Sequence, residues 1–341
     1  MNRSLLLAVI AGRETSVIDD VADSEEVEPN FLRRQMASGR VVIMQRDGEP
    51  PLGIGEGLKT KINANIGIKK HVSMGISSIV VHAGFTLEML EKLRNSKRIM
   101  GMVSKGGSFT SAWMLQNSRE NPFLSHFDEI CGALSEKNVV LSLGNTMRSG
   151  CIHDQMDGPQ EMEIEMNARL ARRANELGVQ VIIEGMGGHV SPEKIAAYVS
   201  YYKKVTGFRP LFVAGPLPLD IGVGYDHISG SIGGSLAAGA GADYLCYITP
   251  SEHLALPNAA QVREGVVAFK IAAHVGDILK YGPRPEDRNL AGYRRARDWE
   301  GQFTAAIDGD RAREIHHQDR AETCSMCGKY CAILIMEEYL K

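Results

Sequence analysis

Residues 179–216 read VQVIIEGMGGHVSPEKIAAYVSYYKKVTGFRPLFVAGP. Two short apolar runs, VQVIIEG and PLFVAGP, stand at the two ends of this stretch, and each finishes on glycine or proline. Between them SPEKIAAYVSYY predicts a helix, because Ser191 suits the N-cap and Pro192 suits the first helical position. The order strand, helix, strand predicts a βαβ unit and therefore a parallel sheet.

The same alternation continues along the chain. Further apolar runs that predict strands stand at 61–67, 78–84, 99–107, 139–145 and 243–250. Helical patterns separate most of them: Gly178 is expected to follow the end of one helix, and Asn258 with Gln261 forms a capping-box pattern at the start of another. Repeated strand–helix pairs predict an α/β barrel.

One connection is unusually short. Only about eleven residues separate INANIG (62–67) from IVVHAG (79–84). A crossover between neighbouring parallel strands needs a dozen residues or more, usually including a helix. These two strands are therefore not expected to be neighbours in one ordinary βαβ unit.

The composition is that of an ordinary globular protein. Of 341 residues, 44% are hydrophobic and 23% are charged, and the net charge of −3 gives no basic footprint for nucleic acid or for a membrane surface. The apolar run LLLAVI near the N-terminus is too short to span a bilayer, and a charged stretch follows it in place of a cleavage site. We expect a cytoplasmic protein with an N-terminal segment (1–60), a barrel (61–284) and a C-terminal region (285–341).

Polar side chains gather where the predicted strands end. In a barrel of this type the reactive groups lie at the carboxyl ends of the strands. The residues at these positions are Asn65, His82, Ser104, Lys105, Asn145, Arg148, Glu184 and Asp220.

Three cysteines stand close together in CSMCGKYC (324–331), and no fourth cysteine follows. Three thiolates at this spacing suit a [4Fe-4S] cluster with one open iron, to which S-adenosylmethionine can bind for reductive cleavage to a radical. The rival interpretation is structural zinc with His316 or His317 as the fourth ligand. The spacing alone leaves both interpretations open, since the usual motif of radical S-adenosylmethionine (SAM) enzymes is CxxxCxxC.

Several longer motifs carry a family resemblance. They are VVHAGF, VSKGGS, LSLGN followed by Arg148 and Gly150, AGPLPLDI with GYDHI, YITPSEHLALPN and CSMCGKYCAI. With them the chain resembles the phosphomethylpyrimidine synthase (ThiC) superfamily, a non-standard radical SAM group. The resemblance implies a (β/α)8 TIM-type barrel with a small C-terminal Fe–S cluster domain.

The resemblance also implies roles for individual residues. Glu184 and Arg148 would be catalytic, and Cys324, Cys327 and Cys331 would hold the cluster. His189 and His253 would bind a divalent metal, zinc or iron. The contacts to the substrate, 5-aminoimidazole ribotide, would come from Asn65, His82, Ser104, Lys105, Gly106, Asn145, Arg148 and Glu184.

The chain departs from the family pattern in four places. Asn145 stands where the family has aspartate, Phe212 stands where a tyrosine is expected, and EGMGGH is one residue longer than its counterpart, which shifts His189 relative to Glu184. A long segment with two strands and two further substrate residues is absent between KINANIG and VVHAG, at the connection that is too short. The barrel is therefore expected to be incomplete or shortened.

These departures favour the branch of 5-hydroxybenzimidazole synthases (Bza). We expect a carbon–carbon lyase that converts the ribotide to 5-hydroxybenzimidazole for the cobalamin lower ligand. The alternatives are phosphomethylpyrimidine synthase of thiamine biosynthesis and a non-catalytic partner subunit. Expected partners are an electron donor such as flavodoxin or ferredoxin and a second chain, in a homodimer or in a heterodimer with a paralogue.

Overall fold

The structure, a computed structural model, describes residues 4–46, 48–63, 76–154, 156–317 and 324–339. These residues belong to two compact units, Met1–Lys280 and Tyr281–Lys341, and each unit is described by itself. The domain limits given above, 1–60, 61–284 and 285–341, stay predictions. Asn65 lies outside the described residues.

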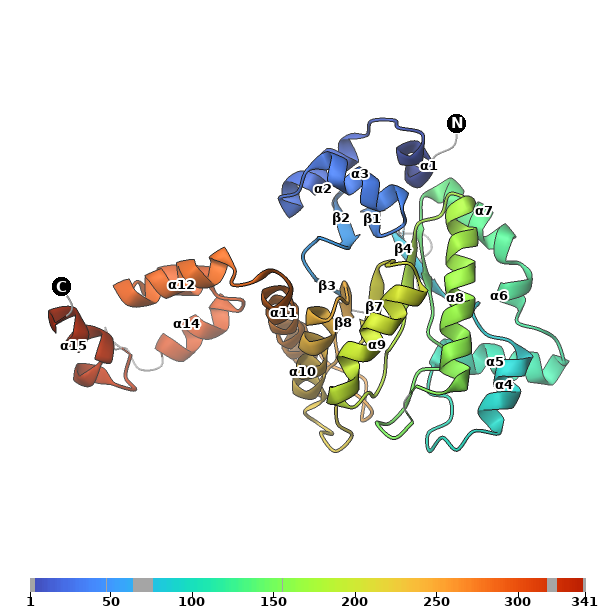
Figure 1. Ribbon diagram of the computed structural model, residues 1–341. Coiled ribbons are helices and arrows are strands. Elements are labelled where there is room, and N and C mark those ends of the chain that lie inside the picture. Colours follow the sequence, from blue (N-terminus) through green and yellow to red (C-terminus); the bar gives the residue numbers. More distant parts are fainter. Residues whose placement is uncertain (1–3, 47, 64–75, 155, 318–323, 340–341) are drawn as a thin grey trace. The chain divides into compact units, whose positions relative to one another are not determined.

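A curled, six-stranded parallel sheet forms the centre of the first unit (Figure 1). Its order is β3-β8-β7-β6-β5-β4, so β3 and β4 are the two edge strands although they follow each other in the chain. The bounds are β3 (Lys61–Asn63), β4 (Ser78–Val81), β5 (Val140–Leu143), β6 (Val181–Glu184), β7 (Leu211–Ala214) and β8 (Tyr244–Cys246). This confirms a shortened TIM-type barrel, and it confirms that the short connection joins strands that are not neighbours.

Helices surround the sheet, and α8, α9 and α10 lie along its outside (Figure 1). The helices of this unit are α1 (Leu5–Ile10), α2 (Ser16–Glu25), α3 (Pro29–Ala37), α4 (Leu87–Arg94), α5 (Lys105–Asn117), α6 (Pro122–Ser125), α7 (Phe127–Lys137), α8 (Gly158–Glu176), α9 (Pro192–Val205), α10 (Asp226–Gly239) and α11 (Ala259–Tyr281). Alternate strand residues, such as Leu141, Ile183 and Val213, pack against these helices in the main core, which also contains Cys131.

An antiparallel hairpin covers the other face of the strands. It consists of β1 (Val41–Arg46) and β2 (Glu49–Gly55), and its Ile54 belongs to one buried cluster with Val140, Ile182 and Phe212. Val140 is the first residue of β5, so the hairpin closes the end where the strands begin. The opposite end, where the strands finish, is left for polar groups.

Most local signals in the sequence act as expected. Gly178 follows α8 with a φ of 82°, which glycine adopts without strain. Asn258 and Gln261 form the capping box through reciprocal hydrogen bonds of 2.9 and 3.0 Å. Pro192 is the first residue of α9, whereas the Ser191 hydroxyl does not cap that helix and donates to Glu193.

Two expectations about secondary structure are wrong. No strand forms over 99–107, because Ser104 caps α5 and the last residues of that run become its first turn. The charged pattern LAGYRRARDWEGQF (290–303), with Trp299 and Phe303 four residues apart, predicts one helix. The structure has two helices there, because Arg297 has a φ of 57° and Asp298 caps the second helix by accepting from the Gly301 amide at 2.9 Å.

The second unit is small and helical. Its elements are α12 (Pro285–Ala296), α13 (Trp299–Ala305), α14 (Gly309–His317), the 3₁₀ helix η2 (Gly328–Tyr330) and α15 (Ala332–Tyr339). Phe303 is buried, and its ring lies 6.4 Å from that of Trp299. Within the described residues, the unit is held by this aromatic contact and by ion pairs such as Arg297 with Glu337 at 3.0 Å.

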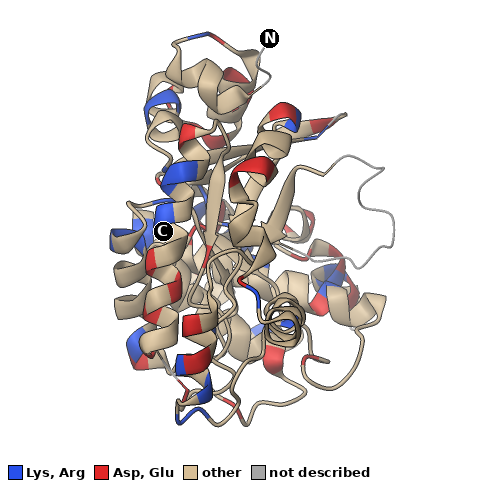
Figure 2. Ribbon diagram, turned by 90° about the vertical axis from the view of Figure 1, so that its right-hand side faces the viewer, with Lys and Arg blue, Asp and Glu red and all other residues tan. Residues whose placement is uncertain are grey.

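On the side of the molecule in Figure 2, Lys and Arg residues are interspersed with Asp and Glu residues along the helices. Throughout the part of the chain that the structure describes, every helix is too short or too polar to cross a lipid bilayer.

A buried ion pair joins α9 to the starts of β7 and β8. Lys203 Nζ lies 2.7 Å from Asp243 Oδ2 and donates to the Arg209 carbonyl at 3.1 Å, and the Leu211 amide donates to the same carboxylate at 2.8 Å. Both charged side chains are less than 9% exposed. Both charges are largely removed from water, so each depends on the other.

Replacing Lys203 by methionine is therefore expected to lower the free energy of unfolding by about 3–5 kcal/mol, because Asp243 keeps a buried charge without its cation. The neighbouring Lys204 is exposed, and Lys204→Met should change stability by less than about 0.5 kcal/mol. Denaturant unfolding measures both variants. Equal stabilities of the two variants would contradict the conclusion that Asp243 depends on Lys203 for its counter-charge.

Candidate functional site

A cavity of about 450 Å³ lies at the carboxyl ends of the strands. Four of the predicted site residues line it: Arg148, Glu184, His189 and His253. They come from three segments, at or after the ends of β5, β6 and β8, so only the fold brings them together. Cys246, the last residue of β8, also lines this cavity.

Glu184 is the last residue of β6, and its carboxylate accepts a hydrogen bond from the Asn145 amide at 3.2 Å. Burial raises the pKa of Glu184, and the Arg148 guanidinium and the Asn145 amide oppose this effect. A carboxyl group with a raised pKa can hold a proton that an exposed glutamate would release, which suits a group that moves protons.

The side chain of Asn145 carries a donor that is not used within the described part of the chain. Its Nδ2 atom is buried and has no hydrogen-bond partner among the described residues. A buried donor without a partner costs about 1–3 kcal/mol, which a ligand acceptor would recover. Arg148 Nη1 donates to the Asn145 carbonyl at 3.2 Å, so the two residues also support each other.

His82 follows β4 and packs tightly against two glycines. An ideal Cβ atom on Gly106 would lie 2.5 Å from the ring, and one on Gly144 would lie 2.7 Å from Nδ1, so neither position accepts a larger residue without moving the histidine. The Nδ1 atom lies 2.9 Å from Thr146 Oγ1. Burial, followed by the nearby Arg148 charge, lowers the pKa of His82 to about 4. The ring is therefore neutral and fixed in place.

Ser104, Lys105 and Gly106 form the start of α5. Ser104 is the N-cap, and its Oγ accepts from the Gly107 amide at 3.1 Å. Lys105 is exposed. Backbone amides of the first turn and the positive end of the helix dipole suit an anion such as phosphate.

The two histidines lie side by side, with ring centroids 5.2 Å apart. The Nδ1 atom of His189 lies 2.6 Å from the Asp220 carboxylate, and that of His253 lies 3.8 Å from Asp226. The Asp220 carboxylate orients Nδ1 of His189, which leaves its Nε2 for a metal, as in many metal sites, and Asp226 lies near the corresponding atom of His253. Burial lowers the pKa of His189 against the opposing effect of Asp220, and this favours the neutral imidazole that binds metals.

The added length of EGMGGH is accommodated by left-handed backbone. Met186 has a φ of 51° and Gly188 has a φ of 87°. A Cβ atom on Gly188 would lie 2.1 Å from the Ser149 carbonyl oxygen, so this position requires glycine. His189 remains next to His253 and lines the same cavity as Glu184.

The three clustered cysteines lie in the second unit. Cys324 and Cys327 are exposed, Cys331 is partly buried, and all three are free thiols. The Cys324 carbonyl accepts from the Gly328 amide at 3.0 Å, which closes the turn before η2. Within the described ranges, no three His, Cys, Asp or Glu side chains are grouped as a complete metal site. The roles of all these residues stay predictions.

Sequence reasoning missed four residues at the site. Asp226 lies within the GYDHI motif, which gave a usable signal, and Thr146 lies within NTMRSG. Arg98 and Glu163 gave none: Arg98 follows a lysine in a polar loop, and Glu163 is one of several glutamates in its helix.

The neutral ring of His82 predicts a pH dependence of stability. Its pKa is about 6.5 when unfolded and about 4 when folded, so between these values the unfolded chain binds the extra proton. The free energy of unfolding is expected to fall by up to about 3 kcal/mol as the pH drops from 6.5 to 4. His82→Gln should flatten this dependence, and the exposed His126→Gln should not. Identical curves of stability against pH for His82→Gln and wild type would refute the role of His82 in this dependence.

Comparison with known protein families matches residues 5–73 and 67–338 to the radical SAM ThiC family. The two matched pieces meet between β3 and β4, where the sequence predicts that a long segment is absent.

Similar proteins span nearly the whole chain. Phosphomethylpyrimidine synthase of Ignicoccus hospitalis is 35% identical over 96% of this chain and 95% of the relative. That of Desulforamulus reducens is 35% identical over 98% of each, and phosphomethylpyrimidine synthase 1 of Methanosarcina mazei is 43% identical over 93% of this chain and 74% of the relative. The first alignment has 418 positions, more than the 341 residues of this chain, so this chain is internally shorter.

These matches confirm the predicted superfamily and, with it, a radical SAM enzyme of the lyase type. The chain therefore belongs to the radical SAM ThiC family.

Proposed function

We propose that this chain is a radical SAM lyase that rearranges 5-aminoimidazole ribotide into a phosphomethylpyrimidine. The observation that carries the proposal is the convergence of Arg148, Glu184, His189 and His253 on one cavity at the strand ends of a ThiC-family barrel. The name of the product follows the relatives, which are phosphomethylpyrimidine synthases.

Family membership implies an iron–sulfur cluster and SAM as cofactors. Cys324, Cys327 and Cys331 fit such a cluster because they are free thiols on one turn, with two of them exposed. The cluster and SAM together would supply a 5′-deoxyadenosyl radical. Every other step proposed below belongs to the side chains of the barrel.

The start of α5 is the proposed site of the ribotide phosphate. The backbone amides of its first turn can donate hydrogen bonds to an anion, and Lys105 adds a positive charge. His82 packs against Gly106 in this turn, so the phosphate end and the imidazole end of the substrate would be held at a fixed separation.

Glu184 and Arg148 would act on the aminoimidazole ring. The carboxyl of Glu184 accepts or returns a proton at the ring amine, since its raised pKa lets it hold one. Arg148 supplies positive charge in the cavity, and the side-chain Nδ2 of Asn145, without a partner among the described residues, would donate to a ring nitrogen or hydroxyl.

His189 and His253 would hold a divalent metal, zinc or iron. Two adjacent imidazoles, with Nδ1 of His189 held by the Asp220 carboxylate and Asp226 near Nδ1 of His253, fit a site that leaves other positions to water or to SAM.

A second product, 5-hydroxybenzimidazole, is favoured by Asn145. The amide presents a buried donor where the family aspartate would present an acceptor, so the substrate contact there is reversed. The shorter barrel and Phe212, which packs against Tyr244 at a centroid distance of 4.6 Å, change the site further.

The proposed partners are an electron donor such as flavodoxin or ferredoxin and a second chain, either a copy or a paralogue. Support for the second chain comes from the edge strand β4, whose Ile79 and Val80 are 39% and 48% exposed. Exposed apolar residues on a strand edge favour association.

Anaerobic reconstitution with iron and sulfide, followed by addition of the ribotide, SAM and dithionite, tests the proposal. We expect brown protein, 5′-deoxyadenosine and a phosphomethylpyrimidine, and we expect Cys327→Ala to lose SAM cleavage while Met326→Ala keeps it. Mass spectrometry identifies the product. A benzimidazole product would select the second candidate, and colourless protein with stoichiometric zinc would reject both. Turnover only with a paralogue would identify a partner subunit.

Glu184→Gln separates radical formation from the later steps. The variant is expected to form 5′-deoxyadenosine and to lose the product by at least 100-fold, because an amide cannot move the proton. Glu161→Gln, at an exposed position on α8, is the matched control. Wild-type product yield from Glu184→Gln would remove Glu184 from the mechanism.

A further inference from the structure

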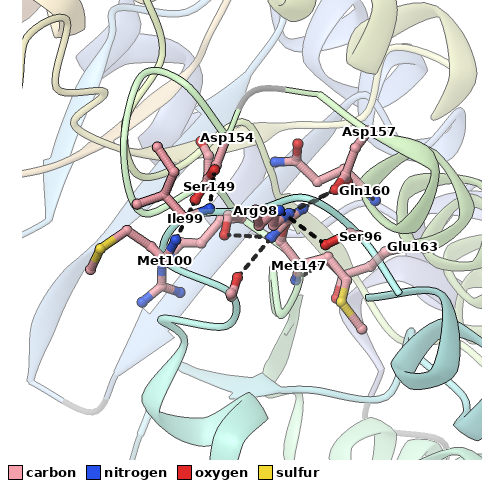
Figure 3. Close-up of polar contacts among 12 residues, drawn as sticks. Ser96, Arg98, Ile99, Met100, Met147, Ser149, Asp154, Asp157, Gln160 and Glu163 are labelled. Carbon is pink, nitrogen blue, oxygen red and sulfur yellow. Dashed lines mark hydrogen bonds and ion pairs between the residues drawn. The ribbon is translucent and has the colours of Figure 1, made fainter. Parts of the chain in front are cut away.

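Arg98 lies in the loop between α4 and α5, and its side chain is only 3% exposed. Its guanidinium forms a bidentate ion pair with Asp157, at 2.7 Å for both contacts. It also donates to the Met147 carbonyl at 2.7 Å (Figure 3). Two longer hydrogen bonds go to the Gly101 carbonyl at 3.1 Å and to the Arg148 carbonyl at 3.4 Å. One side chain therefore contacts three separate segments.

The 145–148 turn is held from its other side by carboxylates. Glu163, which is buried on α8, accepts from the Thr146 and Met147 amides at 2.7 Å each. Glu184 accepts from the Asn145 amide. The peptide groups of this turn are thus held at their N–H atoms by glutamates and at their carbonyls by Arg98.

A second acidic residue, Asp154, binds the loop that carries Arg98. Asp154, 4% exposed, accepts from the Ile99 and Met100 amides at 2.7 Å each (Figure 3). Asp157 also caps α8 by accepting from the Gln160 amide at 3.2 Å. Two acids at the start of α8 therefore bind the loop that leads to Ser104 and α5.

We propose that Arg98 is a positioning residue that fixes the turn carrying Asn145 and Arg148 relative to the loop that leads to the start of α5. The inference rests on the proposed function, in which these two segments bind the ring and the phosphate of one ribotide. Both ends of the substrate must be held at one separation, and a misplacement of about 1 Å is enough to cost roughly 100-fold in rate.

Arginine is required at this position because of its geometry. The guanidinium presents five N–H donors in a rigid plane, and here they reach five acceptor atoms. Lysine has the same charge but presents one compact ammonium group, which cannot reach acceptors on three segments at once. Arg98→Lys keeps the positive charge but is therefore not expected to keep the turn in position.

The test compares Arg98→Lys with Arg94→Lys, a control at an exposed position at the end of α4. Calorimetry on the cluster-free protein measures binding of 5-aminoimidazole ribotide. We expect Arg98→Lys to bind at least 10-fold more weakly and Arg94→Lys to bind within 2-fold of wild type. Melting temperatures show whether each variant is folded.

Two further readouts separate positioning from general damage. In Arg98→Ala, millimolar guanidinium should restore at least part of the ribotide affinity, whereas it should not help Arg94→Ala. Hydrogen exchange of the Thr146 and Met147 amides should accelerate at least 10-fold in Arg98→Lys, while amides of β6 stay protected.

The outcomes distinguish this inference from the proposed function. Wild-type protein that fails to bind the ribotide would reject the proposed substrate, and the exchange of the two amides would still decide the role of Arg98. Unchanged exchange in Arg98→Lys would overturn the inference. If wild-type protein binds the ribotide, equally tight binding by Arg98→Lys would also overturn the inference.

Discussion

The strands β5, β6 and β7 are buried on both faces, and this constraint determines where the polar groups of the barrel can lie. One face packs on the surrounding helices and the other packs on the β1–β2 hairpin at the end where the strands begin. A parallel strand buried in this way has room for reactive side chains only where it finishes. Glu184 and the 145–148 turn stand at such positions.

Burial also determines the charges at the site. It raises the pKa of Glu184 and lowers the pKa values of His82 and His189, so each of these groups is shifted toward its neutral form. Arg148 differs, because a guanidinium remains protonated in proteins. Among the described residues, the cavity therefore combines the Arg148 cation with Glu184 and His189, two groups that can gain or lose a proton, an arrangement suited to a polar, anionic substrate.

Much of the barrel could be predicted from local sequence. Apolar runs located β4 to β8, and Gly178 and Asn258 marked helix ends by their own backbone and side-chain chemistry. The run at 99–107 was misleading because its composition resembles a strand, whereas the capping hydroxyl of Ser104 starts a helix there.

The candidate site was less accessible to sequence reasoning. Motifs located His189 and His253, but the carboxylates at their Nδ1 atoms could be paired with them only in three dimensions. Arg98 and Glu163 act on backbone atoms of a distant turn, and any residue type can supply backbone atoms. No pattern of side chains could therefore reveal those contacts.

The burial of two other cysteines affects how iron would be distributed along the chain. Burial raises the pKa of Cys131 to about 11 and that of Cys246 to about 12. Near neutral pH these thiols keep their protons, and a protonated thiol is a poor ligand for a metal ion. During cofactor assembly they would not compete with Cys324 and Cys327 for iron, although Cys246 lines a cavity large enough to admit small ions.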